Sequence, residues 1–403
     1  MADGTDIGAA MAQEAAARGI AGFVAMAADA AGVLHAQAGG QRGLGSAAPM
    51  TLDTVFRIAS MTKPLTSVAA MQLVEQGRLA LDTPIGALLP ALAAPRVLEG
   101  FDAAGAPILR PARGAVTLRH LLTHSAGYGY DTWNPDLARA YAHAGMAPNP
   151  VDWAWVAQAP LLFDPGTRWN YSIATDLVGR AVEAASGQTL DAYLRDHVCG
   201  PLGMHDTMFV PDAGQRRRLA GMHQRQPDGS LPAIDHPVAE TTAPFMGGGR
   251  ALSTGPDYLR FLRMLLRGGE LDGVRVLQAD TVADMGRNHI GDAVVTPLRS
   301  ANPARSNDAD LFPGMIQKWG LGFLINTAAG PCGRSADSLA WAGIFNTYFW
   351  IDPAAGVAGL VLMQILPFAD AGALGLLGAF ERGIYASGEA ELNRPGFAGG
   401  FKP

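Results

Sequence analysis

The alternation of hydrophobic and polar positions predicts strands near both ends of the chain and helices between them. Residues 5–18 have the spacing of an amphipathic helix, and residues 22–40 are typical of two short strands joined at an Ala-Gly turn. The last quarter is again typical of strands, in residues 319–325, 338–353 and 357–365. This order predicts an α/β protein of the α+β type, with one sheet built from both termini.

The middle of the chain carries the start and stop residues of several helices. A helix is expected from Ser60 to Gln76, because Pro64 is tolerated only near a first turn and Gly77 suits the position after a helix. Further helices are expected in residues 117–127 and 174–187, and in a segment opened by Ser253 or Thr254 as cap with Pro256 in its first turn. Residues 97–111 are typical of a hairpin, and residues 286–314 are polar and irregular.

These elements predict two domains. Residues 1–84 and 312–403 would form the sheet domain, and residues 85–311 a largely helical insertion that covers a cleft. The pattern leaves open that part of the insertion returns to the sheet domain.

Composition narrows the class of protein. The 403 residues are 49% apolar and 16% charged, which indicates a compact fold. The net charge of −6 and the lack of a basic run argue against a nucleic-acid partner. Cys199 and Cys332 do not make a disulfide framework and are expected to be buried thiols in a reducing compartment.

The apolar residues 357–380 are interrupted by Gln364, Pro367 and Asp370 and favour a buried strand, a turn and a helix over a membrane span. The first residues carry Asp3 and Asp6 and no long apolar run, so we expect no signal peptide and a soluble, cytoplasmic protein.

Candidate chemistry begins with Ser60 and Lys63. The chain has 27 arginines but only three lysines, Lys63, Lys318 and Lys402. Lysine can lose its proton in a protein and arginine cannot, so Lys63 is a candidate for proton transfer. Its i, i+3 spacing puts it on the same helix face as Ser60, where it could activate the hydroxyl. A solvent-facing lysine in an ordinary first turn is the structural alternative.

Other candidates each have a structural alternative. Tyr171 could act as a base beside a cation, or simply pack at a helix start. Trp341, Ala342 and Gly343 could form an open strand edge for a ligand, or pack under a helix. His120 and His124 have i, i+4 spacing but no evident third metal ligand, so no metal is expected, and one of them is expected to cap or pack.

The sequence contains neither a phosphate-binding loop nor the serine motif of an α/β-hydrolase. The glycines 247–249 lack the Gly-Lys-Ser/Thr sequence of a phosphate-binding loop. No Gly-x-Ser-x-Gly motif occurs, which disfavours an α/β-hydrolase.

Taken together, "SMTK" on a helix, "YS" at a later helix start and "WAG" on a late strand resemble the serine β-lactamase and penicillin-binding superfamily. The chain is most similar to class C β-lactamases and the β-lactamase-like carboxylesterases, from about residue 15 to 385. Accessory stretches that match are "VFRIASMTKPLT", "GRLALDTPI", "TLRHLLTHSAGYGY", "DPGTRWNYS" and "GGGRALST". The resemblance implies a mainly antiparallel sheet with flanking helices.

The resemblance also implies roles for single residues. Ser60 would be the nucleophile, and Lys63 and Tyr171 a coupled proton relay. The backbone N–H groups of Ser60 and Ile344 would form the oxyanion hole. Trp341, Gly343, Tyr128 and Tyr130 are expected to bind substrate, and no cofactor is expected.

Two departures bear on the substrate. The family's Tyr-x-Asn is here Tyr171-Ser172-Ile173, and the cation that starts the third motif is here Trp341. A tryptophan cannot pair with a substrate carboxylate. We therefore expect a carboxylesterase for neutral short-chain or aryl esters, with a small-molecule ester as partner and the oligomeric state open. A β-lactamase, a D-amino-acid peptidase, an acyltransferase and a non-catalytic sensor of acyl ligands are the alternatives.

Overall fold

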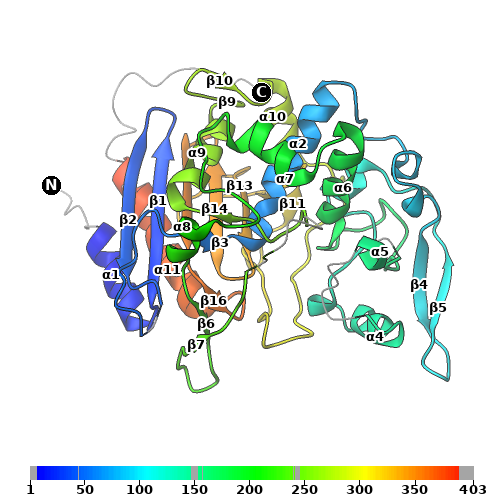
Figure 1. Ribbon diagram of the computed structural model, residues 1–403, viewed down its shortest axis with the longest axis horizontal. Helices are drawn as coiled ribbons and strands as arrows, with labels where there is room; N and C mark the ends of the chain where they lie inside the picture. The colour runs from blue at the N-terminus through cyan, green and yellow to red at the C-terminus, as the bar shows by residue number, and fades with distance from the viewer. Residues whose placement is uncertain are drawn as a thin grey trace.

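A seven-stranded antiparallel sheet forms the centre of the molecule (Figure 1). The computed structural model describes residues 7–43, 45–146, 153–156, 158–238, 240 and 246–389. The strand order is β11-β12-β13-β14-β15-β1-β2, and every neighbouring pair is antiparallel. Both chain ends contribute strands, which confirms the predicted fold class.

The described helices are α1 (Ile7–Ala17), α2 (Thr62–Glu75), α3 (Leu118–Leu122), α4 (Pro135–His143), α5 (Trp153–Val156), α6 (Ala174–Ser186), α7 (Leu190–Leu194), α8 (Ala213–Arg217), α9 (Gly255–Leu266), α10 (Ala279–Met285) and α11 (Ala371–Glu389). The central sheet comprises β1 (Gly22–Asp29), β2 (Val33–Gly40), β11 (Gln317–Trp319), β12 (Leu324–Asn326), β13 (Leu339–Gly343), β14 (Thr347–Asp352) and β15 (Val357–Leu362). The smaller strands are β3 (Phe56–Arg57), β4 (Arg96–Phe101), β5 (Pro107–Pro111), β6 (Met222–Gln224), β7 (Ala233–Ile234), β8 (Leu252–Ser253), β9 (Glu270–Leu271), β10 (Val274–Arg275) and β16 (Ile365–Leu366).

The central strands are buried on both faces, and their side chains alternate between two cores. In β1, Val24 and Met26 belong to the core that contains α2 and α9, whereas Phe23 and Ala25 belong to the core formed with α1 and α11. This alternation is the two-residue period of a strand. In β13 it directs Trp341 to the same side of the sheet as α2.

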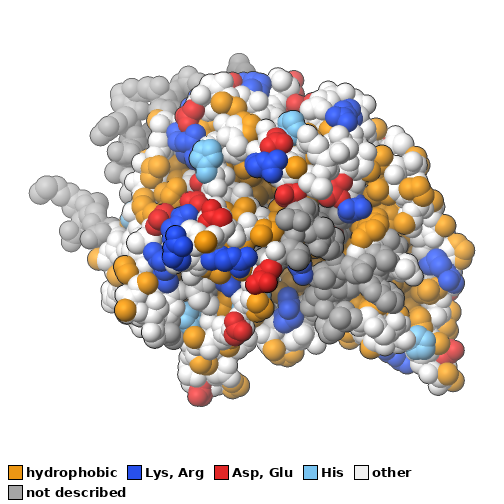
Figure 2. Space-filling model, in the orientation of Figure 1, with side chains coloured by type: hydrophobic (Ala, Val, Ile, Leu, Met, Phe, Trp, Pro, Cys, Tyr) orange, Lys and Arg blue, Asp and Glu red, His pale blue; other side chains and the backbone are white. Residues whose placement is uncertain are grey.

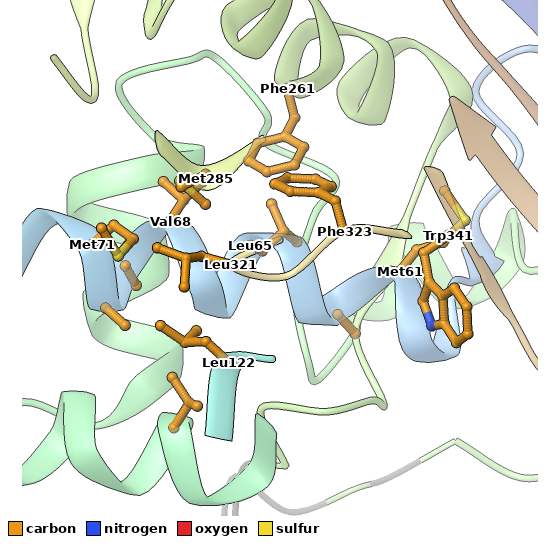
Figure 3. Packing of buried hydrophobic residues seen from close by; sticks show 14 of the residues in the cluster. Met61, Leu65, Val68, Met71, Leu122, Phe261, Met285, Leu321, Phe323 and Trp341 are labelled. Atoms are coloured by element: carbon orange, nitrogen blue, oxygen red, sulfur yellow. The ribbon is translucent and has the colours of Figure 1, made fainter. Parts of the chain in front are cut away.

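Helix α2 lies inside the larger core. Every residue from Thr62 to Leu73 is buried, so the helix is enclosed on all sides. Figure 3 shows Leu65, Val68 and Met71 of α2 among side chains from several other segments, including Phe261 of α9 and Met285 of α10. A helix packed in this way has little freedom to shift, which fixes the residues at its start.

The boundary between the two predicted domains stays a prediction. The strands of the central sheet lie in residues 22–40 and 317–362, inside the two segments assigned to the sheet domain. Helix α9, from the predicted insertion, packs on β1 and β15. The β4–β5 hairpin, α4 and α5 lie at the end of the molecule opposite α1 and β2 (Figure 1).

Several local predictions are confirmed, and two need correction. The N-cap of α9 is Thr254, whose side chain accepts a hydrogen bond from the Asp257 N–H, and α6 ends at Gly187 in a left-handed conformation. The helix expected to end at Gly127 ends at Leu122. Cys199 is buried as expected, but Cys332 is partly exposed, and both thiols are free.

Neither a membrane-crossing helix in the described part of the chain nor a uniformly charged patch on the face of Figure 2 is seen. No helix in the described part of the chain is long and apolar enough to cross a bilayer. On the face shown in Figure 2, basic and acidic side chains lie interspersed, most densely over α8.

Candidate active site

Ser60 lies in a tight turn between β3 and α2. A 3₁₀-helical turn, Ala59–Met61, leads directly into α2, and Ala59 has a φ of 45°. A left-handed backbone is unfavourable for alanine and persists only where surrounding contacts enforce it. Here the Ala59 carbonyl accepts a hydrogen bond from Thr62 Oγ1 (2.6 Å), and the Ile58 N–H donates to the Ala251 carbonyl (3.1 Å). The turn leaves Ser60 partly exposed just before a helix that is buried from Thr62 to Leu73.

Lys63 is 1% exposed, and its ammonium makes three hydrogen bonds. Its Nζ donates to Ser60 Oγ (3.1 Å), to the Tyr130 hydroxyl (3.0 Å) and to the Gly248 carbonyl (2.7 Å). The predicted pairing of Ser60 and Lys63 is therefore present as a direct contact. All three donors of the ammonium have acceptors, which fixes the position of Nζ beside the serine.

Tyr130 and Tyr171 both contact Lys63, but in different ways. The Tyr130 hydroxyl accepts a hydrogen bond from Lys63, whereas Lys63 Nζ lies over the Tyr171 ring, 4.8 Å from its centroid. The Tyr171 hydroxyl instead accepts a hydrogen bond from Trp341 Nε1 (3.1 Å). Burial raises the pKa of Tyr130 well above its ordinary value, with smaller contributions from neighbouring Tyr171 and Asp176. Tyr130 therefore stays protonated at neutral pH.

The contact between Tyr130 and Lys63 was not foreseen from the sequence, which placed Tyr130 only among substrate-binding residues. The two residues are 67 positions apart, and no spacing rule links them. The only hint was the run of aromatic residues in the loop after α3.

His124 packs against the ring of Tyr171. Its Nδ1 lies 3.0 Å from Ser172 Oγ, and its ring lies edge-on to Tyr171 with centroids 5.0 Å apart. Burial, together with the charge of Lys63, lowers the pKa of His124 well below its ordinary value, so the ring is neutral. His120 instead completes a capping box with Thr117 at the start of α3. The two histidines thus cap and pack, and the described residues contain no cluster of three or more groups suited to a metal ion.

The glycine turn contributes to the site through its backbone. Gly248 donates its N–H to Asp176 Oδ1 (2.7 Å), and its carbonyl accepts from Lys63. A side chain at Gly247 would meet the Thr175 carbonyl at 2.7 Å, so the turn packs directly on α6. Burial raises the pKa of Asp176, and the charge of Lys63 opposes that shift.

The predicted catalytic, oxyanion-hole and substrate-binding residues are placed in different surroundings. Ser60, Tyr130, Tyr171 and Ile344 line a cavity of about 640 Å³, whereas Trp341, Gly343 and Tyr128 are not part of its lining. Trp341 is 6% exposed and packs against Tyr171, with its ring edge-on to Trp319. Trp341 therefore lies one layer behind the cavity lining. Tyr128 is buried in the core.

Gly343 is needed for packing against the turn that carries Ser60. A Cβ there would lie 2.4 Å from the Ile58 carbonyl and 2.3 Å from Thr347 Oγ1. Thr347 Oγ1 itself donates to the Ile58 carbonyl (3.3 Å). The close approach brings the end of β13, and with it Ile344, next to the turn that carries Ser60.

The chain is similar to known enzymes of acyl chemistry over most of its length. The chain is 34% identical over 350 residues to monacolin J acid methylbutanoyltransferase from Aspergillus terreus, covering 84% of this chain and 83% of that protein. It is 32% identical over 364 residues to lovastatin esterase from Penicillium rubens, covering 86% and 90%.

A solved structure of a mutant simvastatin synthase from Aspergillus terreus superposes with a TM-score of 0.82 at 32% identity, covering 95% of each chain. The Beta-lactamase family model matches residues 7–379. This match spans nearly the whole described chain, and the chain belongs to the β-lactamase family.

Proposed function

We propose that this protein is a serine carboxylesterase that forms an acyl-enzyme on Ser60. The observation that carries the proposal is the 3.1 Å contact between Lys63 Nζ and Ser60 Oγ at the edge of a cavity large enough for an ester. Similarity to an esterase and to an acyltransferase supports acyl chemistry of this kind.

In the proposed reaction, Lys63 acts as the neutral amine, so that the Ser60 hydroxyl donates to its lone pair. Ser60 Oγ attacks the ester carbonyl and its proton passes to Lys63. The oxyanion would be stabilised by the backbone N–H groups of Ser60 and Ile344, two residues that line the same cavity. Tyr171 would give its proton to the departing alkoxide and recover one from Lys63, which restores the neutral amine. Water would then attack the acyl-enzyme and give a proton to Lys63, and this proton would return to Ser60 Oγ as the acid leaves. Tyr130, protonated and bonded to Lys63, would hold the amine in place.

We further propose that the substrate is neutral next to the scissile bond. Trp341 occupies the position where the third motif would otherwise supply a cation, and its indole N–H is already used by Tyr171. A carboxylate adjacent to the reacting carbonyl would find no partner there. This disfavours the alternatives of a β-lactamase and a D-amino-acid peptidase. A cytoplasmic setting stays a prediction.

Acyl transfer to an alcohol is the second candidate, and one relative is named for such a reaction. The acyl-enzyme is common to both activities, and only the second acceptor differs. Adding a primary alcohol to the assay and measuring the ratio of new ester to free acid separates them. Transfer is indicated if the ratio exceeds what the alcohol-to-water concentration ratio gives.

The proposal is tested with 4-nitrophenyl butyrate and a chromogenic cephalosporin. We expect turnover of the ester to exceed that of the cephalosporin, and intact mass spectrometry to show one acyl group on the wild type and none on Ser60→Ala. Folded Ser60→Ala with near-normal esterase activity would exclude the mechanism. A wild type that is acylated by neither compound, yet binds acyl ligands, would favour the sensor.

A further inference from the structure

Asp176 is a buried acidic residue in the lining of the cavity that Ser60 borders. It lies in the first turn of α6, where a carboxylate can stabilise a helix by its charge alone. Here, however, Asp176 Oδ1 accepts a hydrogen bond from the N–H of Gly248 (2.7 Å), 72 positions away in the sequence. The side chain therefore joins α6 to the glycine turn, residues 247–249.

The glycine turn is held from α2 as well. Thr66 Oγ1 donates a hydrogen bond to the Gly247 carbonyl (2.8 Å), and Lys63 Nζ donates one to the Gly248 carbonyl (2.7 Å). A Cβ at Gly248 would lie only 2.9 Å from Asp176 Oδ1, so the turn has little room to shift between the two helices. Asp176 and Lys63 therefore hold the same residue, Gly248, from two different helices.

Asp176 and Lys63 also act on each other by charge. Burial raises the pKa of Asp176, whereas the Lys63 ammonium, the Gly248 N–H and Arg250 oppose that rise. Lys63 is 1% exposed, so water screens little of this interaction. The negative charge of Asp176 therefore favours a positive charge on the lysine.

Further titratable or charged groups face this pair, namely Tyr130, Tyr171, His124 and Arg250. Burial keeps Tyr130 protonated and His124 neutral, and Arg250 is cationic. Asp131 is the other acidic residue of the cavity lining, and its charge acts on Arg305 and Tyr141. Asp176 therefore supplies a negative charge beside the lysine.

We propose that Asp176 is a positioning residue that holds Lys63 through Gly248 and stabilises the ammonium formed when Lys63 takes the proton of Ser60. The inference rests on the proposed function, because it concerns the base of that reaction. As Ser60 Oγ bonds to the ester carbonyl carbon, one proton moves from Oγ to Lys63 Nζ. Asp176 exchanges no proton and keeps its charge throughout. It would act as the third group that orients a base beside a nucleophile.

Asp176→Asn separates the charge from the hydrogen bond, because its amide oxygen can still accept the Gly248 N–H. Without the charge, the protonated amine is less favoured, so the acid limb of kcat/KM should move to lower pH by about one unit. The proton is only partly transferred in the transition state, so kcat should fall by about 3- to 10-fold. KM should change by less than about twofold, since Asp176 is not assigned to substrate binding. Asp176→Ala also removes the hydrogen bond and should lower kcat by about tenfold more.

Asp257→Asn is the matched control. Asp257 also lies in the first turn of a helix, α9, is 9% exposed, and has a pKa raised by burial. Its carboxylate likewise accepts a backbone N–H, that of Asp206 (2.8 Å), but it is not part of the cavity lining. Asp257→Asn should leave kcat and the pH dependence for 4-nitrophenyl butyrate unchanged, whatever it does to stability.

A second measurement does not depend on activity. The chain has only three lysines, Lys63, Lys318 and Lys402, so protein labelled with ¹³C at lysine Cε should give a simple NMR spectrum in which Lys63→Arg identifies the Lys63 signal. In Asp176→Asn, the Lys63 signal should titrate at a pH lower by about one unit than in the wild type. In Asp257→Asn it should titrate as in the wild type, and the signals of Lys318 and Lys402 should be the same in all proteins.

The proposal is overturned if Lys63 titrates at the same pH in Asp176→Asn and in the wild type, or if Asp176→Asn keeps kcat and the acid limb of the wild type. A lower melting temperature without a change in either pH dependence would show that Asp176 only stabilises the fold. A raised KM at unchanged kcat would show that it contacts the substrate instead. The proposed function fails separately, if folded Ser60→Ala keeps its esterase activity.

Discussion

Replacing Tyr130 by phenylalanine tests the contact that the structure adds to the predicted site. The change removes one oxygen and keeps the ring, which packs tilted against Tyr171 with centroids 5.2 Å apart. Lys63 would keep Ser60 Oγ and the Gly248 carbonyl as acceptors but would lose the third. In a site where Lys63 is 1% exposed, water cannot readily replace the missing acceptor.

The size of the effect follows from the kind of bond that is lost. A hydrogen bond from a charged donor contributes about 1.5–3 kcal/mol, and leaving a buried donor unpaired costs a similar amount. If the lysine must be held in place in the transition state, kcat/KM should fall by about 10- to 100-fold. The unpaired donor also destabilises the folded state, so the melting temperature should fall by a few degrees, at about 2–4 °C or less for each kcal/mol in a chain of this size.

The assay measures kcat/KM for an aryl and an alkyl butyrate in the wild type, Tyr130→Phe and Tyr171→Phe. If Tyr130 only holds the lysine, Tyr130→Phe lowers both rates by the same factor. If Tyr171 protonates the leaving group, Tyr171→Phe lowers the alkyl ester far more, because an alkoxide needs the proton and a nitrophenolate does not. The reasoning is refuted if Tyr130→Phe keeps activity within twofold of the wild type. A selective loss on the alkyl ester in Tyr130→Phe would move the proton-transfer role to Tyr130.

Three further changes probe the neighbours of Ser60. Lys63→Arg should lower kcat by about 10²- to 10⁴-fold, because arginine keeps the charge but cannot exchange a proton, and retention of most activity would leave Lys63 as a fixed charge only. Trp341→Phe removes the N–H that binds Tyr171 and should cost about 1 kcal/mol, seen as a several-fold fall in kcat/KM; an unchanged rate would show that this bond does not position the phenol. Gly343→Ala places a Cβ 2.4 Å from the Ile58 carbonyl and should destabilise the fold by about 1–3 kcal/mol in thermal unfolding and lower activity with it, whereas wild-type stability would contradict the close packing.

The features that the sequence predicted well depend on neighbours along the chain. The start of the Ser60 helix followed from Pro64, and the cap of α9 from Thr254 and Pro256. Hydrophobic residues on both faces predicted the buried strands at the two ends. In each case the interacting atoms lie within a few residues, so the pattern carries the information.

Features that depend on distant contacts could not be predicted in this way. Lys63 donates a hydrogen bond to the Gly248 carbonyl, 185 positions away in the sequence. The residues around either position give no local pattern that predicts this bond. Helix α3 ends early because His124 adopts a φ of 56° and turns its ring toward Tyr171, which is a tertiary preference. Trp341 was correctly placed on a strand, but its position behind Tyr171 depends on how β13 meets the loop before α6.

The backbone turn that positions Ser60 is held by contacts with distant segments of the core and not by its own local sequence. A left-handed alanine costs on the order of 1–3 kcal/mol, and the local sequence offers no glycine to relieve it. Contacts to Ala251 before β8, to Thr347 of β14 and from Gly343 of β13 hold the turn in place. Because these segments also border the cavity, any change that loosens their packing should displace the serine from Lys63 before it unfolds the protein. Substitutions at Ala251, Thr347 or Gly343 are therefore expected to lower activity without unfolding the whole protein, although none of these residues lines the cavity.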